Sequence, residues 1–264
     1  MNNHAIGLLD SGVGGFSIVK KVIQKLPNES TIFIGDSAHM PYGDRTTEEV
    51  IELTRKSVNF LLSKQVKLII FACNTATAAA MDILQKEVDP QIIGVIQSGS
   101  LAAARITKNK KVAVVATKVT IDSHAYRDEL TFRDPEIEVT ELATPRLAPL
   151  IEKHEDNLEE VKTSLAPLAG KDFDTLVLGC THYPLAQAEF EAAVGNKVQV
   201  VDPADQVAQY TYNVMKRDHL FSDPNLPPKH EYYTTGDPVK FADLGKSFME
   251  VDELPVQQID TENF

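Results

Sequence analysis

The sequence predicts an α/β protein made of two similar α/β halves, each with a mainly parallel β-sheet flanked by helices. Three observations lead to this prediction. Short, almost wholly apolar segments alternate with amphipathic segments of helix length, which is typical of parallel sheets covered on both faces. One apolar run of strand length ends at Cys73 and a second ends at Cys180. These are the only two cysteines of the chain.

The first half is predicted to contain strands at 5–9, 31–35, 68–72 and 92–96. The first strand ends in a glycine-rich turn, Asp10 to Gly15, and a helix follows it until Pro27. Thr46-Thr47-Glu48-Glu49 has the pattern of a capping box and predicts the start of the next helix. A further helix is expected to open at Ala78, and the fourth strand is expected to end at Gln97-Ser98-Gly99.

The alternation then starts again, with strands predicted at 111–116, 137–142, 175–179 and 198–201. Helices are predicted around Tyr126, at 145–152, at 158–168 and after Asp202-Pro203. A last strand at 230–235 precedes a short helix that Gly245 is expected to end. We place the first domain at 1–97 plus 208–264, with the tail returning to the first half, and the second domain at 98–207.

Composition and charge argue against membrane, secreted and nucleic-acid-binding proteins. No apolar run approaches the roughly 18–20 residues that a membrane span needs, so no membrane partner is expected. The N-terminus has no basic region before its first apolar run, which argues against a signal peptide and favours the cytoplasm, where thiols stay reduced. The net charge of −12, without a cluster of basic residues, disfavours nucleic acid as a partner.

Residues that follow the strands are the first candidates for a site, because open α/β sheets bind ligands beyond the carboxyl ends of their strands. The sequence has neither the lysine of a phosphate-binding loop nor a Gly-x-Gly-x-x-Gly turn after a strand. The candidates are Asp10, Ser11, Asp36, Pro41, Tyr42, Gly43, Cys73, Asn74, Thr75, Thr117, Thr120, Cys180, Thr181 and His182.

The two cysteines could have a purely structural role instead of a function in catalysis or binding. A lone cysteine is usually a small buried hydrophobe, but polar neighbours at both strand ends favour a function. The two cysteines could form one disulfide bond, but a disulfide is not expected in the reducing cytoplasm. Zinc could use Cys180 and His182, yet no second pair of ligands at short spacing completes a site, so no metal is expected. The threonines and Asn74 could be helix caps, a role compatible with ligand contact.

Two thiols in one cleft permit a particular reaction. One thiolate removes a proton from a carbon on one face and the other thiol returns a proton to the opposite face, which inverts that centre. Neighbours such as Asp10 and His182 would set which thiol is ionised. We therefore expect the active site in the cleft between the two halves.

Four stretches carry a resemblance to a known family: Asp10-Ser11-Gly12-x-Gly14-Gly15, Pro41-Tyr42-Gly43, Cys73-Asn74-Thr75 and Gly179-Cys180-Thr181-His182-Tyr183-Pro184. Their order and spacing, from about residue 5 to 207, resemble glutamate racemase. The resemblance implies two α/β domains, a homodimer and no cofactor, neither pyridoxal phosphate nor metal. It also implies that two cysteines interconvert L- and D-glutamate, with the D-isomer used for peptidoglycan.

By position, Cys73 resembles the thiol that deprotonates D-glutamate and Cys180 the thiol that deprotonates L-glutamate. Asp10, His182 and Glu152 match assisting residues. Gln97-Ser98, Thr144 and Asp202-Pro203 depart from the family pattern, and none is an expected base. The residues that match substrate contacts are Asp10, Ser11, Pro41, Tyr42, Gly43, Cys73, Asn74, Thr75, Thr117, Thr120, Cys180, Thr181 and His182.

Three alternatives remain open at the level of the sequence. The first is a relative that acts on aspartate or another small acid. The motif of the aspartate relatives resembles Cys-Thr-Glu, with glutamate at the position of His182. A binding protein on the same scaffold would have no need for two matched thiols. A thiol redox or zinc protein would use Cys73 and Cys180 differently.

Overall fold

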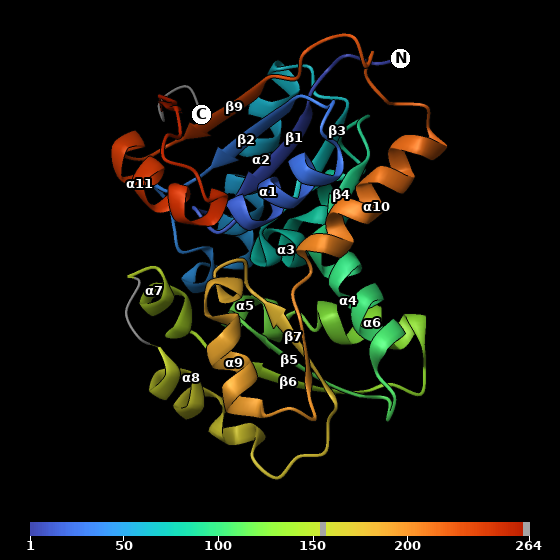
Figure 1. The fold of residues 1–264 in the computed structure, drawn as a ribbon, viewed down its shortest axis with the longest axis vertical. Helices are drawn as coiled ribbons and strands as arrows, with labels where there is room; N and C mark the ends of the chain where they lie inside the picture. Colours follow the sequence, from blue (N-terminus) through green and yellow to red (C-terminus); the bar gives the residue numbers. More distant parts are fainter. Residues whose placement is uncertain (154–156, 261–264) are drawn as a thin grey trace.

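Two parallel β-sheets, each covered by helices, make up the structure (Figure 1). The computed structural model describes residues 1–153 and 157–260. The first sheet has the order β10-β9-β2-β1-β3-β4 and the second the order β6-β5-β7-β8, and all neighbouring strands are parallel. The predicted fold class is confirmed.

The strands alternate with helices along the whole chain. The strands are β1 (Ile6–Asp10), β2 (Thr31–Gly35), β3 (Leu68–Phe71), β4 (Ile92–Gly94), β5 (Lys111–Ala116), β6 (Glu138–Ala143), β7 (Thr175–Gly179), β8 (Gln199–Val201), β9 (His230–Thr234) and β10 (Val256–Gln258). The α-helices are α1 (Phe16–Lys25), α2 (Thr47–Ser63), α3 (Asn74–Leu84), α4 (Val95–Ile106), α5 (Lys118–Asp122), α6 (Ala125–Arg133), α7 (Leu147–Ile151), α8 (Leu158–Leu165), α9 (Gln187–Val194), α10 (Ala204–Arg217) and α11 (Pro238–Met249). Single 3-10 turns are η1 (Tyr42–Asp44), η2 (Ala166–Leu168) and η3 (Tyr183–Ala186).

The apolar strands are buried on both faces because a helix layer lies on each side of the sheet. On one face of the first sheet, Leu8 and Phe33 pack with apolar residues of α1, α10 and α11. On the other face, Leu9 and Ile69 pack with α2 and α3. The first of these cores continues through α4 into the second sheet, where it includes Val114. The two halves therefore share a hydrophobic core.

Several predicted boundaries differ from the observed ones. The strand predicted at 92–96 ends at Gly94, and Val95 begins helix α4, so Ile96 is buried on a helix. Helix α3 begins at Asn74, directly after Cys73, and not at Ala78. Gly245 lies within α11, where a Cβ would come 2.6 Å from the ring of Phe16, so close packing explains this glycine. Helix α9 and strand β10 were not predicted.

The tail of the chain joins the first sheet, where β9 pairs with β2 and with β10. Residue 97, the predicted end of the first segment, lies inside α4, which runs from the first sheet towards the second (Figure 1). The division into 1–97 plus 208–264 and 98–207 stays a prediction. Within the described residues no helix has the length and apolarity to cross a bilayer. Of the acidic residues around the start of α8, Glu155 and Asp156 lie outside the described part of the chain.

Candidate active site

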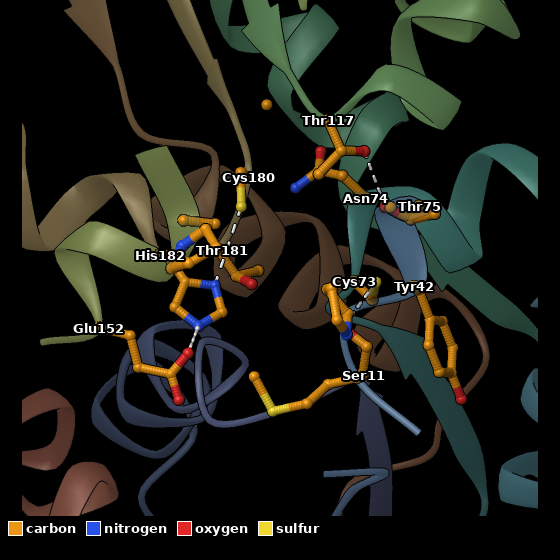
Figure 2. A pocket seen from close by; sticks show the side chains of 16 residues that line it. Ser11, Tyr42, Cys73, Asn74, Thr75, Thr117, Glu152, Cys180, Thr181 and His182 are labelled. Carbon is orange, nitrogen blue, oxygen red and sulfur yellow. Dashed lines mark hydrogen bonds and ion pairs between the residues drawn. The ribbon is translucent and has the colours of Figure 1, made fainter. Parts of the chain in front are cut away.

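Both cysteines line one cavity of about 190 Å³, at the carboxyl ends of β3 and β7 (Figure 2). A parallel sheet brings the residues after all its strands to one edge, and here the edges of two sheets meet. The cavity is lined by Ser11, Met40, Pro41, Tyr42, Gly43, Cys73, Asn74, Thr75, Thr117, Ala148, Pro149, Glu152, Gly179, Cys180, Thr181 and His182.

Cys73 lies at the N-terminus of α3 as its cap residue. Its sulfur accepts a hydrogen bond from the backbone N–H of Ala76 at 3.4 Å and donates to the Ser11 hydroxyl at 3.6 Å. Burial and the negative charge of Asp10 raise the pKa of the Cys73 thiol to about 12, and the hydrogen bonds oppose this only in part. Cys73 is therefore a neutral thiol near pH 7.

Cys180 faces a different environment, made by an imidazole and a carboxylate. The Cys180 sulfur lies 3.8 Å from Nδ1 of His182, and Nε2 of His182 lies 3.6 Å from Oε2 of Glu152. Burial alone lowers the pKa of His182, but the interactions with Cys180 and Glu152 and the charge of Asp10 outweigh it and raise the pKa to about 10. His182 is thus a cation between a sulfur and a carboxylate (Figure 2).

Asp10 is buried behind the cavity and does not line it. One carboxylate oxygen accepts the backbone N–H of Gly12 at 2.8 Å, and the other accepts the Thr181 hydroxyl at 3.2 Å. Burial raises the pKa of Asp10 to about 6, although His182 and these hydrogen bonds act in the opposite direction. Asp10 therefore links the end of β1 to the loop that carries Cys180.

Three threonine hydroxyls meet across the two halves. Thr75 and Thr117 are 3.0 Å apart between their Oγ1 atoms, and Thr117 and Thr120 are 3.1 Å apart. Thr117 also caps α5, so the cap role and a place in the cavity wall coincide. Thr120 is buried behind the other two and does not line the cavity.

Asp36, also named as a candidate, supports the wall without lining it. Its carboxylate accepts the hydroxyls of Tyr42 at 2.7 Å and Thr235 at 2.6 Å, and Nδ1 of His39 lies 2.7 Å away. These contacts hold the segment that contains Pro41 and Gly43 against the end of β2. The Tyr42 ring forms part of the cavity wall (Figure 2), and its hydroxyl is directed to Asp36 by the hydrogen bond described above.

The sequence reasoning missed Met40, Ala148, Pro149 and Gly179 as lining residues. Met40, Ala148 and Pro149 carry no reactive group, so only their position next to Pro41 or Glu152 could have indicated them. The hydroxyl of Tyr126 was not predicted either. It lies in the other half and donates a hydrogen bond to Asn74. In residues 1–153 and 157–260 no cluster of three or more His, Cys, Asp or Glu side chains has the geometry of a metal site.

Comparison with known proteins identifies relatives of this chain. Residues 6–211 match the Asp/Glu/Hydantoin racemase family. The glutamate racemase of Lactobacillus helveticus is 68% identical over the full length of both chains, and that of Lactococcus lactis subsp. lactis is 37% identical over 100% of this chain and 98% of its own.

Solved structures agree with the sequence relatives. Glutamate racemase isoform RacE1 of Bacillus anthracis has a TM-score of 0.95 at 36% identity, covering 99% of each chain. The Francisella tularensis glutamate racemase in complex with D-glutamate has a TM-score of 0.93 at 30% identity, covering 100% of each chain. The two-sheet fold, the paired cysteines in one cavity and these matches together place the chain in the Asp/Glu/Hydantoin racemase family.

Proposed function

We propose that this protein is a cofactor-independent glutamate racemase that inverts Cα of L- and D-glutamate with two thiols. The observation that carries the proposal is that the only two cysteines of the chain line one cavity from two different sheets. The names of the relatives support the substrate, and one similar structure contains D-glutamate. A cavity of about 190 Å³ suits a molecule of amino-acid size.

The proposed reaction is a proton transfer at each face of Cα. Starting from L-glutamate, the Cys180 thiolate takes the Cα proton and becomes a thiol. The Cys73 thiol then gives its proton to the opposite face of the carbanion, which yields D-glutamate and a Cys73 thiolate. The reverse direction uses the same groups with their roles exchanged, so no atom or electron is left over.

The surroundings of the two sulfurs support this assignment of roles. The cationic imidazole of His182 faces the Cys180 sulfur and would stabilise a thiolate there, and Glu152 holds the other ring nitrogen. Asp10 is the assisting group on the Cys73 side, where its charge acts on that thiol. In the free protein these interactions favour Cys73 as the proton donor and Cys180 as the base, which is the state that accepts L-glutamate.

Apart from the His182 cation, the groups proposed to bind the substrate are neutral donors. No Lys or Arg is among the described residues that line the cavity, so hydroxyls, amides and the backbone N–H groups at the start of α3 are proposed to hold the carboxylates and stabilise the carbanion together with His182. The proposed contacts are Ser11, Pro41, Tyr42, Gly43, Cys73, Asn74, Thr75, Thr117, Cys180, Thr181 and His182, with Asp10 and Thr120 acting from behind the wall.

Incubation in heavy water with L-glutamate and, separately, L-aspartate tests both the reaction and the substrate. A thiol carries a single exchangeable proton, so D-glutamate should form with deuterium at Cα while recovered L-glutamate keeps its protium during the initial phase. Inversion of aspartate and not of glutamate would favour the alternative of a relative that acts on aspartate. If neither amino acid gains deuterium at Cα, the proposed reaction is refuted.

Single Cys73→Ser and Cys180→Ser variants distinguish a racemase from a binding protein. Each should lose racemisation by several orders of magnitude, because a serine hydroxyl is a far weaker acid than a thiol. Wild-type racemisation by either variant would contradict the two-thiol mechanism. Unchanged activity with a chelator, together with loss of activity on thiol alkylation, would separate this mechanism from a zinc site.

We also propose a homodimer in the cytoplasm that supplies D-glutamate for peptidoglycan synthesis. Rescue of a bacterial strain that requires D-glutamate tests the supply role, and sedimentation of the purified protein tests the dimer. A Cys73→Ser protein that rescued growth equally well would contradict the supply role.

A further inference from the structure

We propose that Tyr126 is a positioning residue that fixes the side-chain amide of Asn74, so that its NH₂ group faces the substrate. The inference rests on the proposed function, because it concerns how a carboxylate substrate is held. Tyr126 was expected only as part of a helix, and its hydroxyl enters the argument through one contact between the two halves.

The contact joins the neighbourhoods of both cysteines. The Tyr126 hydroxyl, on α6, donates to Oδ1 of Asn74 at 2.7 Å, and both side chains are buried. Asn74 is the first residue of α3 and follows Cys73 directly. On the other side, a Cβ on Gly179 would lie 3.2 Å from Cε2 of the tyrosine ring. Gly179 directly precedes Cys180, so one ring packs beside one cysteine and bonds the neighbour of the other.

The direction of the hydrogen bond follows from the chemistry of the phenol. A buried hydroxyl proton needs an acceptor, and the amide oxygen of Asn74 provides it. The pKa of Tyr126 is raised, by burial first and then by the charges of Asp202 and Cys180, so the hydroxyl keeps its proton. With Oδ1 engaged, the two N–H donors of Asn74 remain for other partners, and the contacts of residues 1–153 and 157–260 include no acceptor for them.

The consequence for a ligand is a fixed donor where charge must be neutralised. Asn74 lines the cavity, and its amide nitrogen lies on the side that faces Cys180 (Figure 2). The described lining residues include no lysine or arginine, and the His182 cation already faces the Cys180 sulfur and Glu152, so a carboxylate on the Asn74 side depends on such neutral donors. A free amide could turn by 180° and present its oxygen to the carboxylate, which is repulsive. Tyr126 prevents this rotation without touching the substrate itself.

Tyr126→Phe removes the hydroxyl and keeps the ring, so it tests the orientation directly. KM for both L- and D-glutamate should rise by about ten-fold or more, as expected for a weakened hydrogen bond to a charged group, with a smaller change in kcat. In an Asn74→Ala background the same substitution should change KM by less than about two-fold, because the amide through which it acts is gone. Equal factors in both backgrounds, or an unchanged KM in the single variant, would overturn the proposal.

Tyr233→Phe is the matched control. It removes a hydroxyl that donates to Glu231 at 2.5 Å on β9, away from the cavity, so KM should stay at the wild-type value. An equal rise in KM in this control would show that any lost tyrosine hydroxyl loosens the fold, which would also overturn the proposal.

A second measurement separates failure of this inference from failure of the proposed function. If the wild type does not racemise glutamate, the proposed function fails, but NMR of the Asn74 side-chain amide still reports its orientation. Residual dipolar couplings of the Asn74 NH₂ group that fit one orientation in the wild type and are averaged in Tyr126→Phe would support a fixed amide. Identical couplings in the two proteins would refute it.

Discussion

Burial acts in opposite directions on the two acid–base groups beside the cysteines. It raises the pKa of Asp10 to about 6, and for His182 the charge and hydrogen bonding of Cys180, Glu152 and Asp10 overcome it and raise the pKa to about 10. Both groups therefore bind protons more tightly in the folded protein than in the unfolded chain. Such perturbed groups in or directly behind a cavity are typical of catalytic sites.

The Asp10 shift predicts a stability difference that depends on pH. Because the pKa rises from 3.8 to about 6 on folding, the folded protein loses stability relative to the unfolded chain as pH rises through this window. Asp10→Asn removes this effect, so its stability relative to the wild type should increase by roughly 3 kcal/mol between about pH 3 and pH 7 and then stay constant. Denaturant unfolding at several pH values measures it, and a constant difference across this range would contradict the shift.

The His182 shift acts in the same direction as the Asp10 shift, in a window at higher pH. Its raised pKa contributes stability that is fully present below its usual value of 6.5 and lost as pH rises towards about 10. Glu152→Gln removes one cause of the shift and should lower the pKa of His182, which histidine NMR measures directly. His230, whose pKa is lowered by burial far from Glu152, should titrate unchanged in the same spectra. A His182 pKa that does not move would mean that Glu152 is not an effective partner.

At this scale the sequence predicted part of the cavity lining. The cysteines, His182 and most of the hydroxyl residues were named because reactive residue types follow strands, and these side chains line the cavity. Asp10 and Thr120 were expected to touch substrate, yet they lie behind the cavity wall, since a strand-end position does not reveal which way a side chain turns. Tyr126 was missed as a site residue because its partner, Asn74, is 52 residues away in the chain.

Among the elements, α2 is a helix whose start was predicted from a local pattern. Thr46 accepts from the backbone N–H of Glu49, whose carboxylate accepts from the backbone N–H of Thr46, which completes the capping box. Thr46→Ala should therefore cost about 1 kcal/mol of stability. Thr47→Ala, one residue further on, removes an exposed side chain that caps nothing and should be nearly neutral. Equal losses in urea unfolding would show that the cap does not act.

Helix α4, which was also not predicted from the sequence, shows the limit of local patterns. Ile92-Ile93-Gly94-Val95-Ile96 has the composition of a buried strand, and Gln97-Ser98-Gly99-Ser100 has that of a turn. In the structure the helix is held by packing against α6, α10 and the second sheet, contacts with residues distant in the chain. Strand β10 was missed because it is a three-residue edge strand with two exposed glutamines.

At the scale of the whole molecule, a buried ion pair outside the cavity connects distant segments of the chain. Lys67 Nζ contacts the carboxylate of Glu29 and also donates to the backbone oxygen of Asn2 and the Ser222 hydroxyl. The ammonium group thus joins four segments of the chain, including the start of the region that returns to the first sheet.

Lys67→Met leaves the Glu29 carboxylate buried without its ammonium partner. We expect a loss of about 3–5 kcal/mol in the free energy of unfolding, and partial recovery in the double variant Lys67→Met/Glu29→Leu. Lys110→Met breaks an ion pair with Asp134 at the surface and should cost far less stability. Similar losses for the two lysines in urea unfolding would argue against a special role for the buried pair.

The confinement of both thiols to one cavity also makes them reporters of motion. The chain has no other cysteine, and Cys73 and Cys180 are both buried, so a thiol reagent reacts only when the cavity admits it or the chain opens. A small alkylating agent and a bulky maleimide would therefore measure two different events, entry into the cavity and separation of the halves. The ratio of their labelling rates, followed with and without glutamate, would time the opening of the cleft in the unmodified protein.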